Sequence, residues 1–141
     1  MIFDSTNLFS DGQAITATAA STNVIDLSPT GTPVGSAAAL VRDIGPGNPL
    51  PIRIQVTEAF NNLTSLTVAL QVDDNSAFSS ATTVETVTIP LADLTLGAFV
   101  NEIYYVPRGT NERYVRLNYT VAGTAPTLGK VTAGIVASHQ E

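Results

Sequence analysis

Apolar and polar residues alternate along much of the chain, most clearly between residues 65 and 73. The apolar positions of that run are Leu66, Val68, Leu70 and Val72. Since successive side chains of a β-strand point to opposite faces, this spacing predicts a strand with one buried face. The same period of two recurs in residues 52–57, 115–121 and 131–135. These four runs predict the main strands of a β domain.

Shorter runs add candidate strands, and turn residues separate all of them. The shorter candidates are residues 13–18, 23–27, 84–89 and 103–106. Glycine, proline, asparagine or aspartate stands between the runs, as in residues 28–31, 45–49, 73–76, 107–109 and 122–123. These residue types supply positive φ angles, fixed turn angles and local backbone bonds. Many short strands with regular turns predict a sandwich or a barrel.

Helical signals are weak. Residues 90–94 are compatible with one helical turn that starts at Pro90. Residues 35–41 are rich in alanine but too short for a stable isolated helix. Strands do not alternate with long helical segments, so a parallel α/β sheet is not expected. A length of 141 residues fits one domain, residues 1–141.

Two segments stand apart from the strand pattern. Residues 1–12 are an N-terminal arm that carries Phe3, Leu8 and Phe9. Such an apolar arm either folds back onto its own core or reaches a neighbouring protein. Residues 28–51 contain five of the 8 prolines. A connection of this length is often functional, and we expect it to be a long proline-rich loop.

The composition is poor in charge and acidic in balance. Charged residues make up 13% of the chain, against about 25% in an average soluble domain. The net charge is −6, with Lys and Arg numbering only 6 in total. Binding to nucleic acid or to an anionic membrane needs clustered cations and is not expected. The sequence shows neither a signal peptide nor an apolar run of the ~20 residues that span a bilayer.

Catalytic and metal-binding motifs are missing. The chain has no cysteine, and its one histidine, His139, lies near the C-terminus, where chains are often mobile. Asp73-Asp74-Asn75 offers oxygen ligands but lacks the spacing of a calcium loop and fits a polar turn. We therefore predict no enzymatic activity, no cofactor and no metal.

Two alternatives stay open. A carbohydrate- or receptor-binding module of a virion would expose a platform of aromatic rings, and the chain has one adjacent aromatic pair, Tyr104-Tyr105. Neighbouring strand residues face opposite ways, so one of these rings points outward as an edge or interface anchor. A small hydrolase would need a carboxylate pair about 5–9 Å apart, and the 12 acidic residues single out none.

Several segments together resemble a known family. They are residues 1–11, 14–27, 56–66 and 73–78, which span most of the chain. In these segments the sequence resembles the small capsid cement, or decoration, proteins of tailed bacteriophages, in particular those of short-tailed phages. The resemblance implies an antiparallel jelly-roll or Greek-key β-sandwich that self-associates on the outer capsid face. It carries no catalytic residues.

The function implied by the resemblance is structural. Such a protein binds the major capsid protein, bridges neighbouring capsomers and stabilises the expanded shell. It is made in the host cytoplasm, ends on the outer surface of the virion and forms homodimers, or else homotrimers. We expect the contacts from the N-terminal arm, the proline-rich loop and the outward tyrosine. The predicted interface residues are Ile2, Phe3, Leu8, Phe9, Arg42, Asp43, Asn48 and Tyr105.

Overall fold

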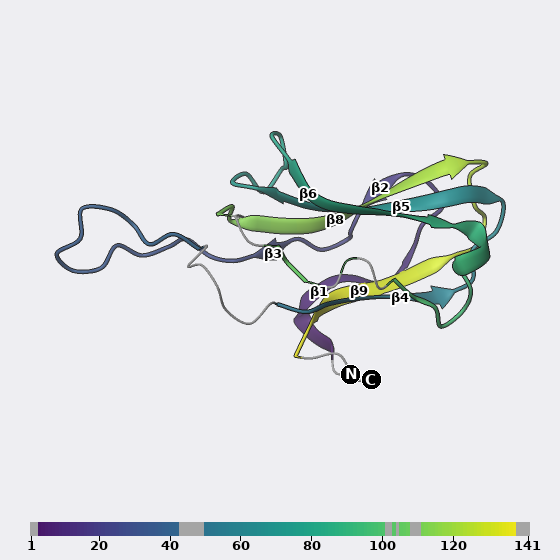
Figure 1. Cartoon of the computed structure of the whole chain (residues 1–141), viewed down its shortest axis with the longest axis horizontal. Helices are drawn as coiled ribbons and strands as arrows, with labels where there is room; N and C mark the ends of the chain where they lie inside the picture. The colour runs from purple at the N-terminus through teal and green to yellow at the C-terminus, as the bar shows by residue number, and fades with distance from the viewer. Residues whose placement is uncertain (1–2, 43–49, 101–102, 104, 108–110, 138–141) are drawn as a thin grey trace.

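The protein is a β-sandwich of two antiparallel sheets packed face to face (Figure 1). The computed structural model describes residues 3–42, 50–100, 103, 105–107 and 111–137. The predicted residues Ile2, Asp43 and Asn48 lie outside these ranges, as do Tyr104 and His139. In the described part of the chain, no helix is long and apolar enough to cross a membrane.

Sheet A has the strand order β1-β9-β4-β7, and sheet B has the order β2-β8-β5-β6, with β3 also pairing with β8. The strands of sheet A are β1 (Phe3–Ala14), β9 (Lys130–Val136), β4 (Ile52–Glu58) and β7 (Phe99–Val100). Those of sheet B are β2 (Ala19–Ala20), β3 (Ile25–Asp26), β8 (Tyr114–Gly123), β5 (Leu63–Asp73) and β6 (Thr82–Pro90). The first and last strands are neighbours, and this order is that of a jelly roll. The predicted fold class is confirmed.

The core lies between the two sheets, where the period-two pattern placed it. The predicted inner face of β5 is buried at every position, from Leu66 at 1% exposure to Val72 at 2%. Ile52, Ile54 and Val56 line the facing sheet and are each 1% exposed. Burying such side chains is worth about 1.5–3 kcal/mol each, so these two strands supply much of the driving force for folding.

Of the two possibilities for the N-terminal arm, the first is observed, because its described residues fold back onto the domain. Residues 3–14 form β1, which pairs with β9 along its length. Phe9 is 0% exposed and belongs to the core. Three register shifts interrupt the pairing, so the apolar residues do not alternate regularly. Because bulges break the period of two, the sequence pattern did not reveal this strand.

Three weaker predictions also need correction. Residues 15–18 turn between β1 and β2, so the strand predicted at 13–18 ends at Ala14. In the candidate at 103–106, the described residues form one isolated bridge, between Tyr105 and Pro51. The run at 23–27 shortens to β3. The helical turn at 90–94 is confirmed as a 3-10 helix, η1 (Leu91–Asp93), which follows Pro90.

Tyr119 lies in the core, and its hydroxyl group is buried there. Its ring is 0% exposed, and its Oη lies 2.8 Å from Ser10 Oγ. The Ser10 hydroxyl donates its own proton to Gln13 Oε1 at 2.7 Å, so Tyr119 donates to Ser10. Burial raises the pKa of Tyr119 well above its usual value, although the bond to Ser10 opposes the shift.

Because the Tyr119 hydroxyl is buried, we expect the folded protein to lose stability at alkaline pH. The folded-state pKa is raised, so stability is fully present below the unfolded pKa of about 10. As the pH rises above that value, stability should fall by about 1.4 kcal/mol per pH unit, because the unfolded chain can release the proton. Urea unfolding as a function of pH measures this slope. Tyr119→Phe should flatten this slope. Equal slopes in the wild type and in Tyr119→Phe would contradict the assignment.

Candidate functional site

Two surface features stand out. One is the outer face of sheet A. The other is residues 28–41 of the predicted proline-rich loop, which leave the sandwich and which we call the arm. We define the outer face of sheet A from the strand register, because directly opposed residues of antiparallel strands share a face. The core residues of β4 point inward, so Pro51 and Arg53, which alternate with them, point outward. Residues paired with these two therefore point outward as well.

The first row across this face joins Phe3, Val136, Pro51 and Tyr105. Phe3 pairs with Val136, whose N–H donates to the carbonyl of Pro51 at 3.0 Å. Pro51 in turn bridges to Tyr105, which is 48% exposed. Every side chain in the row is apolar or aromatic.

The second row joins Leu8, Gly134 and Arg53. Gly134 pairs with Leu8 on one side and with Arg53 on the other. A Cβ at Gly134 would lie 2.9 Å from the carbonyl oxygen of Asn7 and 3.0 Å from Leu8 Cδ2, so only glycine lets this segment of β1 pack so closely. The guanidinium carbon of Arg53 lies 3.2 Å from the centre of the Phe99 ring. Arg53 Nε is buried, and it has no hydrogen-bond partner among the residues that the structure describes.

The outer face of sheet B is different. Its outward positions on β5, β8 and β6 are mostly polar, and include Thr67, Gln71, Arg116, Asn118, Thr86 and Thr88. A sandwich in water normally carries polar residues on both outer faces. The two apolar rows of sheet A are therefore the exception, although Val136 is only 4% exposed and the next outward pair, Gln55 with Thr132, is polar. Their most exposed rings, Tyr105 at 48% and the neighbouring Phe99 at 41%, mark a candidate interaction site.

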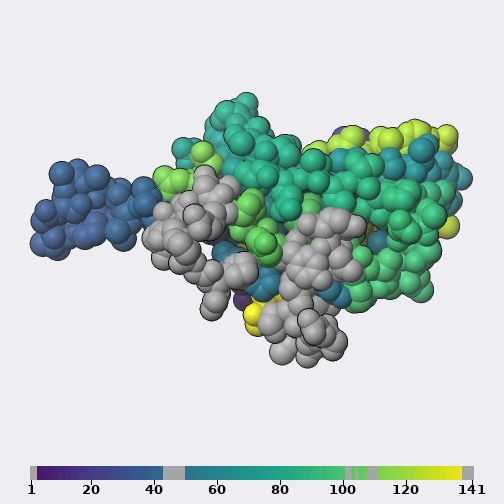
Figure 2. All heavy atoms as spheres, in the orientation of Figure 1, coloured from purple at the N-terminus to yellow at the C-terminus, as the bar shows by residue number. Residues whose placement is uncertain are grey.

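The arm, residues 28–41, projects from one end of the sandwich between β3 and β4 (Figures 1 and 2). Apart from Thr30, all of its residues are exposed. Val34 is 108% exposed, Leu40 58% and Val41 55%. No charged residue occurs between Asp26 and Arg42. The arm thus holds apolar side chains in water without burying them against its own domain.

Local bonds give the arm its shape. Leu40 N–H donates to the carbonyl of Gly31 at 3.0 Å, which ties the two limbs together. Ser36 N–H donates to the carbonyl of Pro33 at 3.0 Å and closes the tip. Gly35 in that turn has a φ of 83°, a conformation that glycine adopts without strain.

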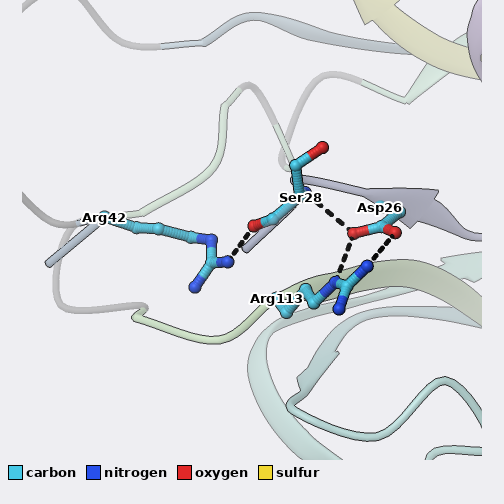
Figure 3. A network of polar contacts seen from close by, with 4 residues as sticks. All are labelled: Asp26, Ser28, Arg42 and Arg113. Atoms are coloured by element: carbon cyan, nitrogen blue, oxygen red, sulfur yellow. Dashed lines mark hydrogen bonds and ion pairs between the residues drawn. The ribbon is translucent and has the colours of Figure 1, made fainter. Parts of the chain in front are cut away.

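A clamp at the base fixes the direction of the arm (Figure 3). Asp26 accepts two bonds of 2.7 Å from the Nε and Nη2 atoms of Arg113, the planar pairing that arginine and carboxylate favour. Ser28 N–H donates to the same carboxylate at 2.8 Å. These bonds, that of Arg113 first, lower the pKa of Asp26 to about 2.

Arg42 ties the returning limb to the same base. Its backbone N–H donates to Asn111 Oδ1 at 2.7 Å. Its guanidinium donates to the carbonyl of Ser28, on the departing limb. Arg42, predicted as an interface residue, therefore holds the two limbs of the arm together where they leave the sandwich.

The predicted interface residues are only partly brought together. Phe3, Leu8 and Tyr105 share the outer face of sheet A, on which the structure adds Arg53 and Val136. Phe9 is enclosed in the core and has no exposed surface to offer a partner. The sequence pattern did not reveal the role of Arg53, because a polar residue alternating with buried ones looks like any solvated strand position.

Chemical groups for catalysis do not converge in the described residues. Among them, no group of three or more His, Asp or Glu side chains could hold a metal ion. Glu112 has a raised pKa, first because burial disfavours its charge and then because it shares a hydrogen bond with Asp74. Neither Glu112 nor Asp74 lines the groove formed by β6, η1 and β7.

The strand order and the two packed sheets define a jelly-roll β-sandwich. The model of the Bbp16 family matches residues 9–135, which is most of the chain. The protein belongs to the Bbp16 family. No curated protein matches the sequence.

Proposed function

We propose that this protein is a structural capsid cement protein. It binds the outer face of a phage capsid and stabilises the expanded shell by bridging neighbouring capsomers. The two apolar rows on the outer face of sheet A carry this proposal, because exposed apolar side chains that lie together mark sites of contact with other proteins. The resemblance of the sequence to phage decoration proteins supports the same conclusion.

The physical properties of the surface suit this role. Within the two rows described above, Arg53 is the one charged residue, and its guanidinium already stacks on Phe99. Interface cores are depleted in charged residues, because desolvating a charge is costly. A specific interface buries roughly 1,600 Å² in total, and a protein that contacts several subunits at once gains from multivalency.

The partners follow from this role. The first is the major capsid protein, and the second is another copy of the chain, as a homodimer or a homotrimer. The net charge of −6 opposes binding to nucleic acid. The protein would be made in the host cytoplasm and would remain on the outer surface of the virion.

Charge placed on the outer face of sheet A tests the proposal. Tyr105→Asp and Arg53→Glu should each reduce binding to expanded capsids that lack the protein, about tenfold or more, because a carboxylate would have to be desolvated in the interface. Leu128→Asp is the matched control, since Leu128 is exposed to a similar degree, 54%, but lies in the turn after β8. Cosedimentation with capsids and the stoichiometry on the shell measure the effect.

Two outcomes would contradict the proposal. Wild-type protein that does not bind expanded capsids would overturn the function. Full decoration by both face variants would show that sheet A is not the contact. Circular dichroism and urea unfolding show whether each variant is folded, and both substitutions are at positions outside the core.

A further inference from the structure

A groove is lined by residues of β6, η1 and β7. The helical turn η1, drawn as a coil, lies at the end of the sandwich opposite to the arm (Figure 1). The groove has a volume of about 400 Å³. Its walls combine apolar residues, such as Val56, Ile89 and Ala92, with the polar residues Thr88 and Thr95. Among the described residues, Asp93 is the one charged residue that lines it. The groove therefore suits an uncharged segment with small side chains.

One wall of the groove is the open edge of β6. In the described residues, β5 is the one strand that pairs with β6. The first half of β6 is protected, because a bulge occurs there and Glu85, opposite the core residue Leu70, points inward. Bulges and inward charges are the devices that keep edge strands from pairing. The last residues of β6, Thr88–Pro90, line the groove. Thr88 and Ile89 have neither device, whereas Pro90 has no backbone N–H to donate to an added strand.

The arm matches the groove in chemistry. Its returning limb, Ala37–Val41, is exposed, uncharged and made of small or aliphatic residues. An extended segment can add to a sheet edge through its backbone and place alternate side chains in a pocket. The chain is acidic, so two copies repel each other, and a segment without carboxylates approaches a second copy at the lowest electrostatic cost.

We propose that the arm of one molecule docks in the groove of a second molecule. The arm and the groove lie at opposite ends, so the arm cannot reach the groove of its own domain (Figure 1). The contact joins two different surfaces, and repetition of it produces a ring or a chain of copies. This inference concerns self-association and does not depend on the proposed binding to a capsid.

A pair of complementary variants tests the contact without any capsid present. Leu40→Asp places a charge on the arm, and Ala92→Trp fills the groove. Each variant alone should be monomeric in sedimentation velocity at concentrations where the wild type associates. Mixed together, they should form a dimer and nothing larger, because one intact arm meets one intact groove. Leu128→Asp and Ala125→Trp, at exposed positions elsewhere, should associate like the wild type.

Cysteine pairs locate the contact directly, since the chain contains no cysteine of its own. Oxidation of a mixture of Ala38→Cys and Thr95→Cys should yield a disulfide-linked heterodimer. A wild type that stays monomeric at every concentration would overturn the inference. So would association that survives both Leu40→Asp and Ala92→Trp, or a mixture of these two variants that forms no dimer. Loss of capsid binding by Tyr105→Asp with association intact separates this contact from the proposed function.

Discussion

Replacing Phe9 with alanine is expected to lower the free energy of unfolding by about 3–5 kcal/mol. Phe9 is 0% exposed and packs in the core from β1, the edge strand of sheet A. The loss combines the transfer of the ring from water with the cavity that remains. A domain of this size is stable by about 5–15 kcal/mol, so the variant should lose a large share of its stability.

Urea unfolding measures this loss. The dependence of the unfolding free energy on urea concentration should stay unchanged if the unfolded state is unaltered. Phe3→Ala is the matched control, because Phe3 lies in the same strand but is half-buried on the outer face. It should cost clearly less than Phe9→Ala. Equal effects of the two substitutions would show that β1 does not dock as described.

The position of Phe9 also decides how the N-terminus can be tested. Deletion of residues 1–9 would remove the first half of β1 and uncover the neighbouring strand β9. The core would lose Phe9 at the same time. Loss of capsid binding by such a truncated protein would report a damaged fold, whereas substitutions such as Tyr105→Asp test the surface alone.

The strands that could be predicted from the sequence are those whose alternation of apolar and polar residues is visible within the strand itself. In β5, β4, β8 and β9 the inward residues recur at every second position, so a single strand suffices to show its buried face. β1 was missed because three register shifts break this period. Its place is fixed by pairing with β9, which lies more than a hundred residues away along the chain.

The candidate surfaces depend still more on long-range pairing. Phe3, Pro51 and Tyr105 are far apart in sequence, and only the register of sheet A places them in one row. The proline-rich segment was recognised as a long loop from its composition. Its direction comes from the pairing of Asp26 with Arg113, 87 residues later, which no local pattern contains.

Removing the clamp, with Asp26→Asn and Arg113→Gln together, should weaken self-association roughly a hundredfold, because each backbone residue freed at the arm's base costs about 1–2 kcal/mol when it is ordered again. An exposed ion pair contributes little to global stability, so the thermal midpoint should hardly change. The amide of Leu27, which donates to the carbonyl of Arg113 at 2.9 Å, should exchange faster with solvent.

The control removes an equivalent ion pair away from the arm. Glu58 binds Lys130 at 2.6 Å, and both side chains are partly exposed, like those of Asp26 and Arg113. Glu58→Gln should leave self-association unchanged. If it weakens association as much as the clamp variant does, general surface charge and not the direction of the arm controls the contact.

The pH dependence provides a second check on the clamp. The pKa of Asp26 is lowered to about 2, so the contribution of the clamp is present above the ordinary aspartate pKa of about 4. It is lost only as the pH falls through about 2. Protection of the Leu27 amide should therefore persist from neutral pH down to about pH 4 in the wild type. If this protection disappears near neutral pH, Asp26 does not hold the arm.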